Sequence, residues 1–175
     1  MSYLEEYEWM ILNEIAYNIS YIYTFDEMKK EILLWLKSLI EFDGALIAKV
    51  EKNPRGAARF SGIVTYGVNP ETLSSWEKDT LESDPTSLLV MSGRNGAYID
   101  NDGFSEEKWE RQPIYRNFYL PNRFYYSMGM AITFKEEPIG MIKLYRSLNK
   151  GSFTTVSYTH LVEIRGEKHW KNGEF

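Results

Sequence analysis

Cysteine is absent from the 175-residue chain, and histidine occurs only twice. Without cysteine the chain has no disulfide, thiolate zinc site, cysteine nucleophile or thioether-linked cofactor. His160 and His169 are nine residues apart, and no cysteine or local cluster of Asp and Glu completes a metal site or a catalytic triad with them. Neither a glycine-rich phosphate loop nor a dinucleotide fingerprint occurs. We therefore expect no catalytic residues, no metal site and no cofactor, and we do not expect an enzyme.

Positive charge and long apolar runs are also scarce. Lys and Arg number 20 against 25 Asp and Glu, which gives a net charge of −5. Because nucleic-acid affinity depends on neutralising phosphates, we expect this chain alone to bind no nucleic acid. No stretch approaches the roughly 20 apolar residues of a membrane span, and the acidic Glu5, Glu6 and Glu8 do not fit a secretory signal. A cytoplasmic protein without membrane contact is expected.

Hydrophobic periodicity divides the chain into helices and strands. Thr24 to Glu27 is a capping box, and Asn69-Pro70 combines an N-cap residue with a proline at the first helical position, so each pattern begins a helix. The helices are predicted over residues 3–23, 25–42, 70–82 and 153–164, and the strands over 45–50, 60–68, 97–100, 125–134 and 139–146. This order predicts one α+β domain over 1–175, with a central antiparallel sheet of about five to six strands.

The strand predicted at 125–134 separates large from small side chains. Met128 and Met130 lie on a bulky face, while Ser127, Gly129 and Ala131 lie on a thin one. If a two-residue loop sets the register with the next strand, its residues Met141 and Tyr145 join the bulky face. We expect the thin face to receive the helices, because small side chains allow close packing.

Aromatic residues are concentrated in the stretch WERQPIYRNFYLPNRF, residues 109–124. Core packing, the wall of a small-molecule pocket and a nucleic-acid stacking platform are three interpretations of such a cluster. The net negative charge disfavours the stacking platform. Core packing and a pocket wall both remain open, and they can coexist.

The stretch 109–124, the hairpin ending GMIKLYR (140–146) and the segment SFTTVSYTHLVEI (152–164) resemble a GAF domain. The resemblance is specifically to the GAF sensory half of LuxR-type helix-turn-helix transcriptional regulators. It covers roughly residues 25–170, with 1–23 as an N-terminal helix before this core. It implies a PAS-like sheet with the terminal helices on one face, and short helices and loops enclosing a ligand pocket on the other. The bulky face would then floor that pocket.

The resemblance implies a sensory domain that binds an unknown small molecule and couples its occupancy to a DNA-binding segment or partner. The N- and C-terminal helices are expected to form a homodimer. The alternative is a ligand-free dimerisation or protein-interaction module with a self-filled core. The Trp-Tyr-Asp spacing of acyl-homoserine-lactone receptors is not matched by Trp76 and Asp84, so that narrower ligand class is not expected. The candidate ligand-binding residues are Trp76, Trp109, Tyr115, Phe118, Tyr66, Tyr98, Met128 and Met130.

Overall fold

The structure is a computed structural model. It describes residues 6–19, 24–52, 58–76, 84, 97–99, 104–135, 137–154, 157 and 161. The helices are α1 (Glu6–Ile19), α2 (Phe25–Leu39), α3 (Pro70–Ser75) and α5 (Glu106–Glu110), with a π-helical turn η3 (Tyr115–Tyr119) and a 3-10 turn η4 (Leu148–Lys150). The strands are β1 (Gly44–Lys52), β2 (Ala58–Tyr66), β3 (Ala97–Ile99), β4 (Tyr126–Phe134) and β5 (Glu137–Arg146).

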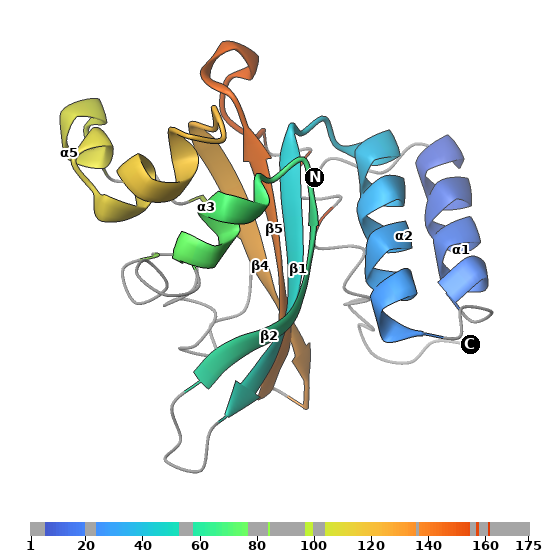
Figure 1. The fold of residues 1–175 in the computed structure, drawn as a ribbon. Coiled ribbons are helices and arrows are strands. Elements are labelled where there is room, and N and C mark those ends of the chain that lie inside the picture. Colours follow the sequence, from blue (N-terminus) through green and yellow to red (C-terminus); the bar gives the residue numbers. More distant parts are fainter. Residues whose placement is uncertain are drawn as a thin grey trace.

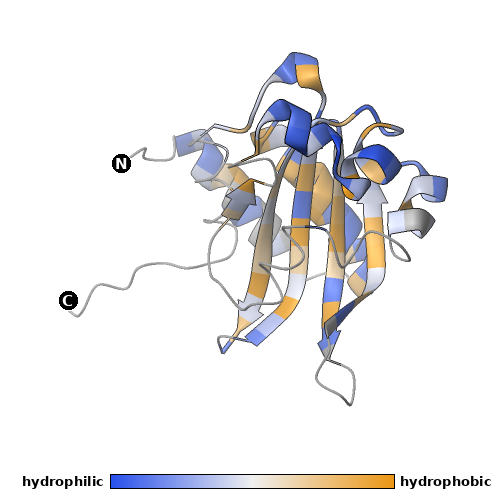
Figure 2. Ribbon diagram, turned by 90° about the vertical axis from the view of Figure 1, so that its left-hand side faces the viewer, coloured by the Kyte–Doolittle hydropathy of each residue, from blue (hydrophilic) through white to orange (hydrophobic). Residues whose placement is uncertain are grey.

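The described strands form one antiparallel sheet in the order β2-β1-β5-β4-β3. Helices α1 and α2 lie on one side of this sheet, and α3, α5 and η3 lie on the other (Figure 1). The predicted α+β class with a central antiparallel sheet is confirmed. We call the two sides the helix side, which faces α2, and the aromatic side, which faces α3, α5 and η3. Figure 2 views the sheet from the aromatic side, where apolar segments run along the strands.

Each side of the sheet has its own hydrophobic core. Local signals predicted the elements that cover both sides. Thr24 accepts a hydrogen bond from the Glu27 backbone N–H, and Asn69 accepts one from the Glu71 N–H, so both predicted N-caps are confirmed. The helix-side core contains Leu33, Leu36, Ile40, Phe42, Ala45, Ile47, Val64, Met128, Met130, Ile142, Leu144, Phe153 and Leu161. The aromatic-side core contains Leu46, Ala48, Val50, Trp76, Trp109, Ile114, Tyr115, Phe118, Tyr119, Phe124, Tyr125, Ala131, Met141 and Tyr145.

The expected faces of β4 are wrong, because a bulge shifts the β4–β5 register. Phe134 pairs with Glu137, as a two-residue connection requires, but the pairing then shifts between Ile132 and Thr133. The extra residue, Ile139, lies on β5. A one-residue shift turns the β4 residues before the bulge to the opposite side of the sheet from the one expected. Met130 therefore pairs with Ile142 instead of Met141.

Met128 and Met130 lie in the helix-side core as a result, together with Leu144. The thin face of β4, with Ser127 and Ala131, shares the aromatic side with the β5 residues 141 and 145. The bulky face of β4 thus lies on the helix side of the sheet, and small side chains underlie the aromatic residues instead.

The predicted C-terminal helix, 153–164, lies mostly outside the described residues. The Ser157 backbone N–H donates to Thr154 Oγ1 at 3.4 Å, which agrees with the predicted cap. Phe153 and Leu161 are buried in the helix-side core. In the described part of the chain, no helix is long and apolar enough to cross a membrane.

Candidate functional site

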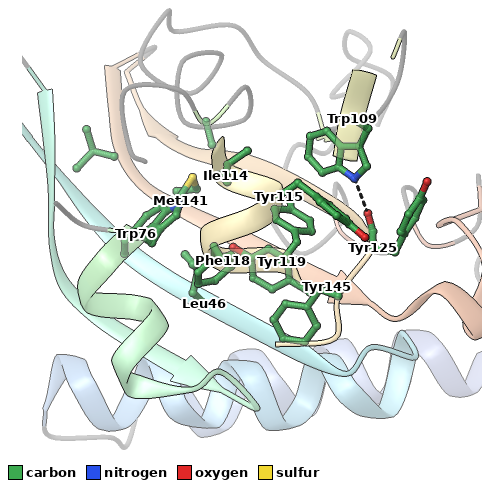
Figure 3. Close-up of a cluster of buried hydrophobic side chains, with 14 residues drawn as sticks. Leu46, Trp76, Trp109, Ile114, Tyr115, Phe118, Tyr119, Tyr125, Met141 and Tyr145 are labelled. Carbon is green, nitrogen blue, oxygen red and sulfur yellow. Dashed lines mark hydrogen bonds between the residues drawn. The ribbon is translucent and has the colours of Figure 1, made fainter. Parts of the chain in front are cut away.

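The aromatic residues of α5 and η3 are turned toward the sheet. Trp109, Phe118 and Tyr119 are at most 1% exposed, and Tyr115 is 9% exposed. Arg116, in the same turn, is exposed. Figure 3 shows these rings in one cluster, with Tyr145 of β5 at one edge of it and Trp109 at another. The π-helical turn η3 places Tyr115, Phe118 and Tyr119 on its inner face, so one short segment supplies three rings to the aromatic side.

These rings pack in edge-to-face and stacked pairs. Trp109 meets Tyr119 edge-on at a centroid distance of 5.0 Å, and Phe118 lies 5.3 Å from Tyr145. Phe124 stacks on Tyr145 at 4.8 Å, and Gly44 permits this position because a Cβ there would collide with the Phe124 ring. Such ring pairs stabilise beyond the apolar area that they bury, by about 0.5–1.5 kcal/mol each.

A buried ion pair lies among these rings. The Lys143 Nζ is 2.7 Å and 2.9 Å from the two carboxylate oxygens of Asp84, and both side chains are fully buried. The Trp76 indole N–H donates to Asp84 Oδ2 at 3.1 Å. The ammonium also lies 5.8 Å and 5.6 Å from the ring centroids of Tyr119 and Tyr145. A charged pair with aromatic contacts is thus the polar centre of an otherwise apolar site.

Sequence reasoning missed this pair. Lys143 alternates on β5 with Met141 and Tyr145, so it shares their side of the sheet. A lysine inside the apolar run IGMIKLYR was the available signal. Its partner Asp84 lies 59 positions earlier, a separation that no local pattern predicts.

Two further polar groups of the aromatic side also bond within the protein. The Tyr119 hydroxyl donates to Ser127 Oγ at 2.6 Å, and the Trp109 indole N–H donates to the Tyr125 carbonyl at 3.3 Å. Burial, together with the nearby Glu110, raises the pKa of Tyr115, so this phenol stays protonated at neutral pH. The site therefore presents neutral hydroxyls, satisfied indoles and one ion pair.

A thin strip on β4 runs between two rows of larger side chains. Tyr98 of β3 pairs with Gly129, and Gly129 pairs with Lys143. Neighbouring strands are about 4.8 Å apart, so Gly129 leaves a position without a side chain between Lys143 and Tyr98. Ser127 and Ala131 continue the strip on either side. The strip thus contributes small side chains to the aromatic side, and Ser127, Gly129 and Ala131 are all buried.

The structure brings together five of the eight predicted ligand-binding residues. Trp76, Trp109, Tyr115 and Phe118 are in the aromatic-side core, and Tyr98 shares that side through its pairing with Gly129. This placement shows that they are neighbours and leaves their role in binding a prediction.

Tyr66 does not join them, and neither do Met128 and Met130. Tyr66 packs on the helix-side core, where its ring meets Phe42 edge-on at 5.9 Å and its hydroxyl accepts a hydrogen bond from Lys37. A register shift in β1–β2, where Gly62 has a φ of +53°, sets the alternation that turns Tyr66 to this side. The structure places these three residues on the helix side of the sheet, and not on the aromatic side with the other candidates.

An open cleft of about 390 Å³ lies elsewhere, at the C-terminal end of α2. Its charged groups pair with one another: Lys150 lies 2.7 Å from Asp43 and 3.1 Å from Glu41. Within the described segments, no group of three or more His, Cys, Asp or Glu side chains could hold a metal ion. His160, His169 and Arg94 lie outside the described residues.

The sheet order and the helices on its two sides define a GAF-like fold. No protein-family model matches the sequence, and no curated protein matches it, so the likeness is structural. The GAF domain of a phosphoenolpyruvate-protein phosphotransferase from Coxiella burnetii superposes with a TM-score of 0.62 at 13% identity, over 90% of this chain and 88% of that one.

Ligand-binding domains of LuxR-type regulators share the same fold. The N-acylhomoserine lactone dependent factor CepR2 from Burkholderia cenocepacia superposes with a TM-score of 0.67 at 15% identity, over 91% of this chain and 89% of that one. Escherichia coli SdiA gives a TM-score of 0.66 at 15% identity, over 92% of this chain and 66% of that one. SdiA has also been solved in complex with octanoyl-rac-glycerol. The neighbours thus include both groups to which the sequence bears a resemblance.

Proposed function

We propose that this chain is the sensory domain of a cytoplasmic transcriptional regulator and binds a small, mostly apolar molecule on the aromatic side of its sheet. The observation that carries the proposal is the aromatic side itself, a cluster of buried rings in which Trp76, Tyr119 and Tyr145 lie beside one buried ion pair. Small-molecule sites have this character, with apolar and aromatic walls and a few polar groups. The ligand-binding regulators CepR2 and SdiA share the fold.

The thin strip on β4 is where we propose that the ligand lies. Gly129 and Ala131 contribute little volume, while Met141 and Lys143 stand on the next strand. A molecule above this strip would contact Met141 on one flank and Tyr98 on the other. Binding would change the transcriptional output by favouring one arrangement of the domain, to the extent that the ligand prefers that arrangement.

We further propose that the domain acts as a homodimer through α1, with the C-terminal helix contributing. Tyr7, Met10 and Tyr17 are 59%, 66% and 64% exposed, and their spacing of three and seven places them along one stripe of the helix. Covering such a stripe with a second copy removes apolar surface from water. The dimer would carry ligand occupancy to a DNA-binding segment or to a partner protein.

Two methionines provide a matched test of the site. Met141 on the aromatic side and Met128 on the helix side are both fully buried, and truncating either one to alanine costs about 2–5 kcal/mol of stability. A thermal-melting screen with uncharged acyl and aromatic compounds should first find molecules that raise the Tm. Met141→Ala should then change the affinity for those molecules several-fold. Met128→Ala should lower the Tm but leave the affinity for those molecules unchanged.

A ligand-free interaction module is the second candidate, and one observation favours it. Both candidate indoles donate to protein acceptors, Trp76 to Asp84 and Trp109 to the Tyr125 carbonyl, so neither requires a ligand oxygen. A screen without hits at saturating concentrations would support this function and refute the sensory one. Equal effects of the two methionine variants on affinity would place the ligand elsewhere.

A further inference from the structure

One side chain joins two of the elements that cover the aromatic side. Asn122 lies shortly after η3, and its side-chain carbonyl accepts a hydrogen bond at 2.8 Å from the backbone N–H of Asn69, directly before α3. The side-chain amide of Asn122 donates to Thr72 Oγ1 in α3 and to the Phe118 carbonyl in η3, each at 2.7 Å. Asn122 therefore connects the beginning of α3 with η3.

The two elements that Asn122 joins carry rings that meet over the sheet. Trp76 follows directly after α3, and Phe118 belongs to η3. Their ring centroids are 6.1 Å apart, and both side chains are fully buried. Met141, the β5 residue on which the proposed ligand would rest, belongs to the same core (Figure 3). A molecule that approaches Met141 between α3 and η3 meets these two rings, so it passes only when the two elements separate.

The hydrogen bonds of Asn122 can break and form again without disturbing the sheet. Asn122 is half-buried and Asn69 is exposed, so water can replace the bonds between them. Each element also joins the sheet through a turn with a left-handed residue: Gly67, with a φ of +63°, lies between β2 and α3, and Arg123, with a φ of +60°, lies between η3 and β4. Segments held by solvent-accessible hydrogen bonds open locally more readily than a sheet does.

We propose that Asn122 is a latch that controls access to the aromatic side, and that separation of α3 from η3 admits the ligand. The proposal rests on the sensory function proposed above and adds how that site opens. The latch closes over the empty and the occupied site alike. Weakening it therefore speeds ligand entry and ligand release by the same factor and leaves the equilibrium affinity unchanged. A residue that only shapes the site would change release without speeding entry.

The probe N-phenyl-1-naphthylamine tests the latch, because it is uncharged and aromatic and its fluorescence rises in apolar surroundings. Stopped-flow mixing with the whole chain measures its association and dissociation rates. Asn122→Ala removes the latch, and Thr72→Val removes one of its partner hydroxyls while keeping the side-chain shape. One lost hydrogen bond changes an opening equilibrium by roughly fivefold. Both variants should therefore raise both rates at least about fivefold and keep the Kd within about twofold of the unmodified protein.

Three controls accompany these variants. Thr72→Ser keeps the hydroxyl and should retain the rates of the unmodified protein. Thr24→Ala removes the cap hydrogen bond of α2 on the helix side, so it lowers stability without touching the latch and should leave both rates unchanged. Met141→Ala should change the affinity for the probe and Met128→Ala should not, which places the probe on the aromatic side.

The outcomes separate this inference from the proposed function. If the probe binds but Asn122→Ala and Thr72→Val leave its association rate unchanged, the latch is overturned while a ligand site stands. The same rates accelerated in Thr24→Ala would show general loosening and would also overturn it. If the probe binds no variant, or if the two methionine variants change its affinity equally, the proposed site is contradicted and the latch with it. Should Asn122→Ala fail to fold, Thr72→Val decides by the same criterion.

Discussion

Replacing Lys143 by methionine removes a buried cation and leaves the Asp84 carboxylate in its apolar surroundings. Breaking a buried pair in this way costs about 3–5 kcal/mol, because the remaining charge keeps its desolvation penalty. In a chain of this size, each kcal/mol lowers the Tm by roughly 2–4 °C. We therefore expect the Tm of Lys143→Met to fall by about 6–20 °C.

The double variant Asp84→Asn, Lys143→Met is the second part of this prediction. Removing both charges leaves no uncompensated ion, and buried pairs replaced by uncharged groups are often neutral in stability. The free energy of unfolding of the double variant should therefore be within about 2 kcal/mol of that of the unmodified protein and higher than that of either single variant. The Trp76 N–H can still donate to the side-chain carbonyl of an asparagine at position 84.

Urea unfolding at neutral pH, followed by tryptophan fluorescence, measures these free energies. Lys150→Met is the matched control, because it is the same substitution in a partly exposed pair with Asp43. The loss there should be about 1 kcal/mol or less. The reasoning is refuted if Lys143→Met costs no more than this control, or if the double variant loses the sum of the two single losses.

Two further predictions concern the pH dependence of stability and the dimer. Partial burial raises the pKa of Asp43, but hydrogen bonds from Lys150 and Ser147 outweigh it and hold the pKa below its ordinary value. A lowered carboxyl pKa stabilises the protein at neutral pH and ceases to do so as the pH falls below about 4. Asp43→Asn should therefore reduce the urea midpoint at neutral pH, and this reduction should shrink as the pH falls below about 4; a reduction that does not shrink would contradict this. In the second prediction, light scattering should show a dimer that Met10→Glu converts to monomer, while Leu120→Glu, at an exposed apolar residue beside η3 on the aromatic side, leaves it intact; a monomeric unmodified protein would refute the α1 interface.

Local signals in the sequence were sufficient to predict α1, α2, α3 and the five strands, whereas α5 and η3 were not predicted as separate elements. The Thr24 and Asn69 caps act within three residues, so they could be recognised without knowledge of the fold. The concentration of aromatic residues in the stretch 109–124 could also be recognised locally, and Trp109, Phe118 and Tyr119 of that stretch are buried. These features depend on residues that are close together in the chain.

Features that depend on pairing between strands could not be predicted in the same way. The bulge at Ile139 moves Met128 and Met130 to the helix side, and the alternation of sizes in β4 gives no sign of it. The contact between Asp84 and Lys143 joins segments that are distant in sequence. The sequence thus indicated the aromatic walls of the candidate site, whereas its floor and its charges required the fold.

Methionine methyl resonances offer the most direct test of a ligand on the aromatic side. Met141 faces that side, whereas Met128 and Met130 lie in the helix-side core. Isotope-labelled methionine methyl groups are recorded by NMR while the best compound from the thermal screen is added to saturation. The account predicts a large shift of the Met141 methyl resonance and little change for the other two. Shifts confined to Met128 and Met130, or none of the three moving at saturation, would contradict it.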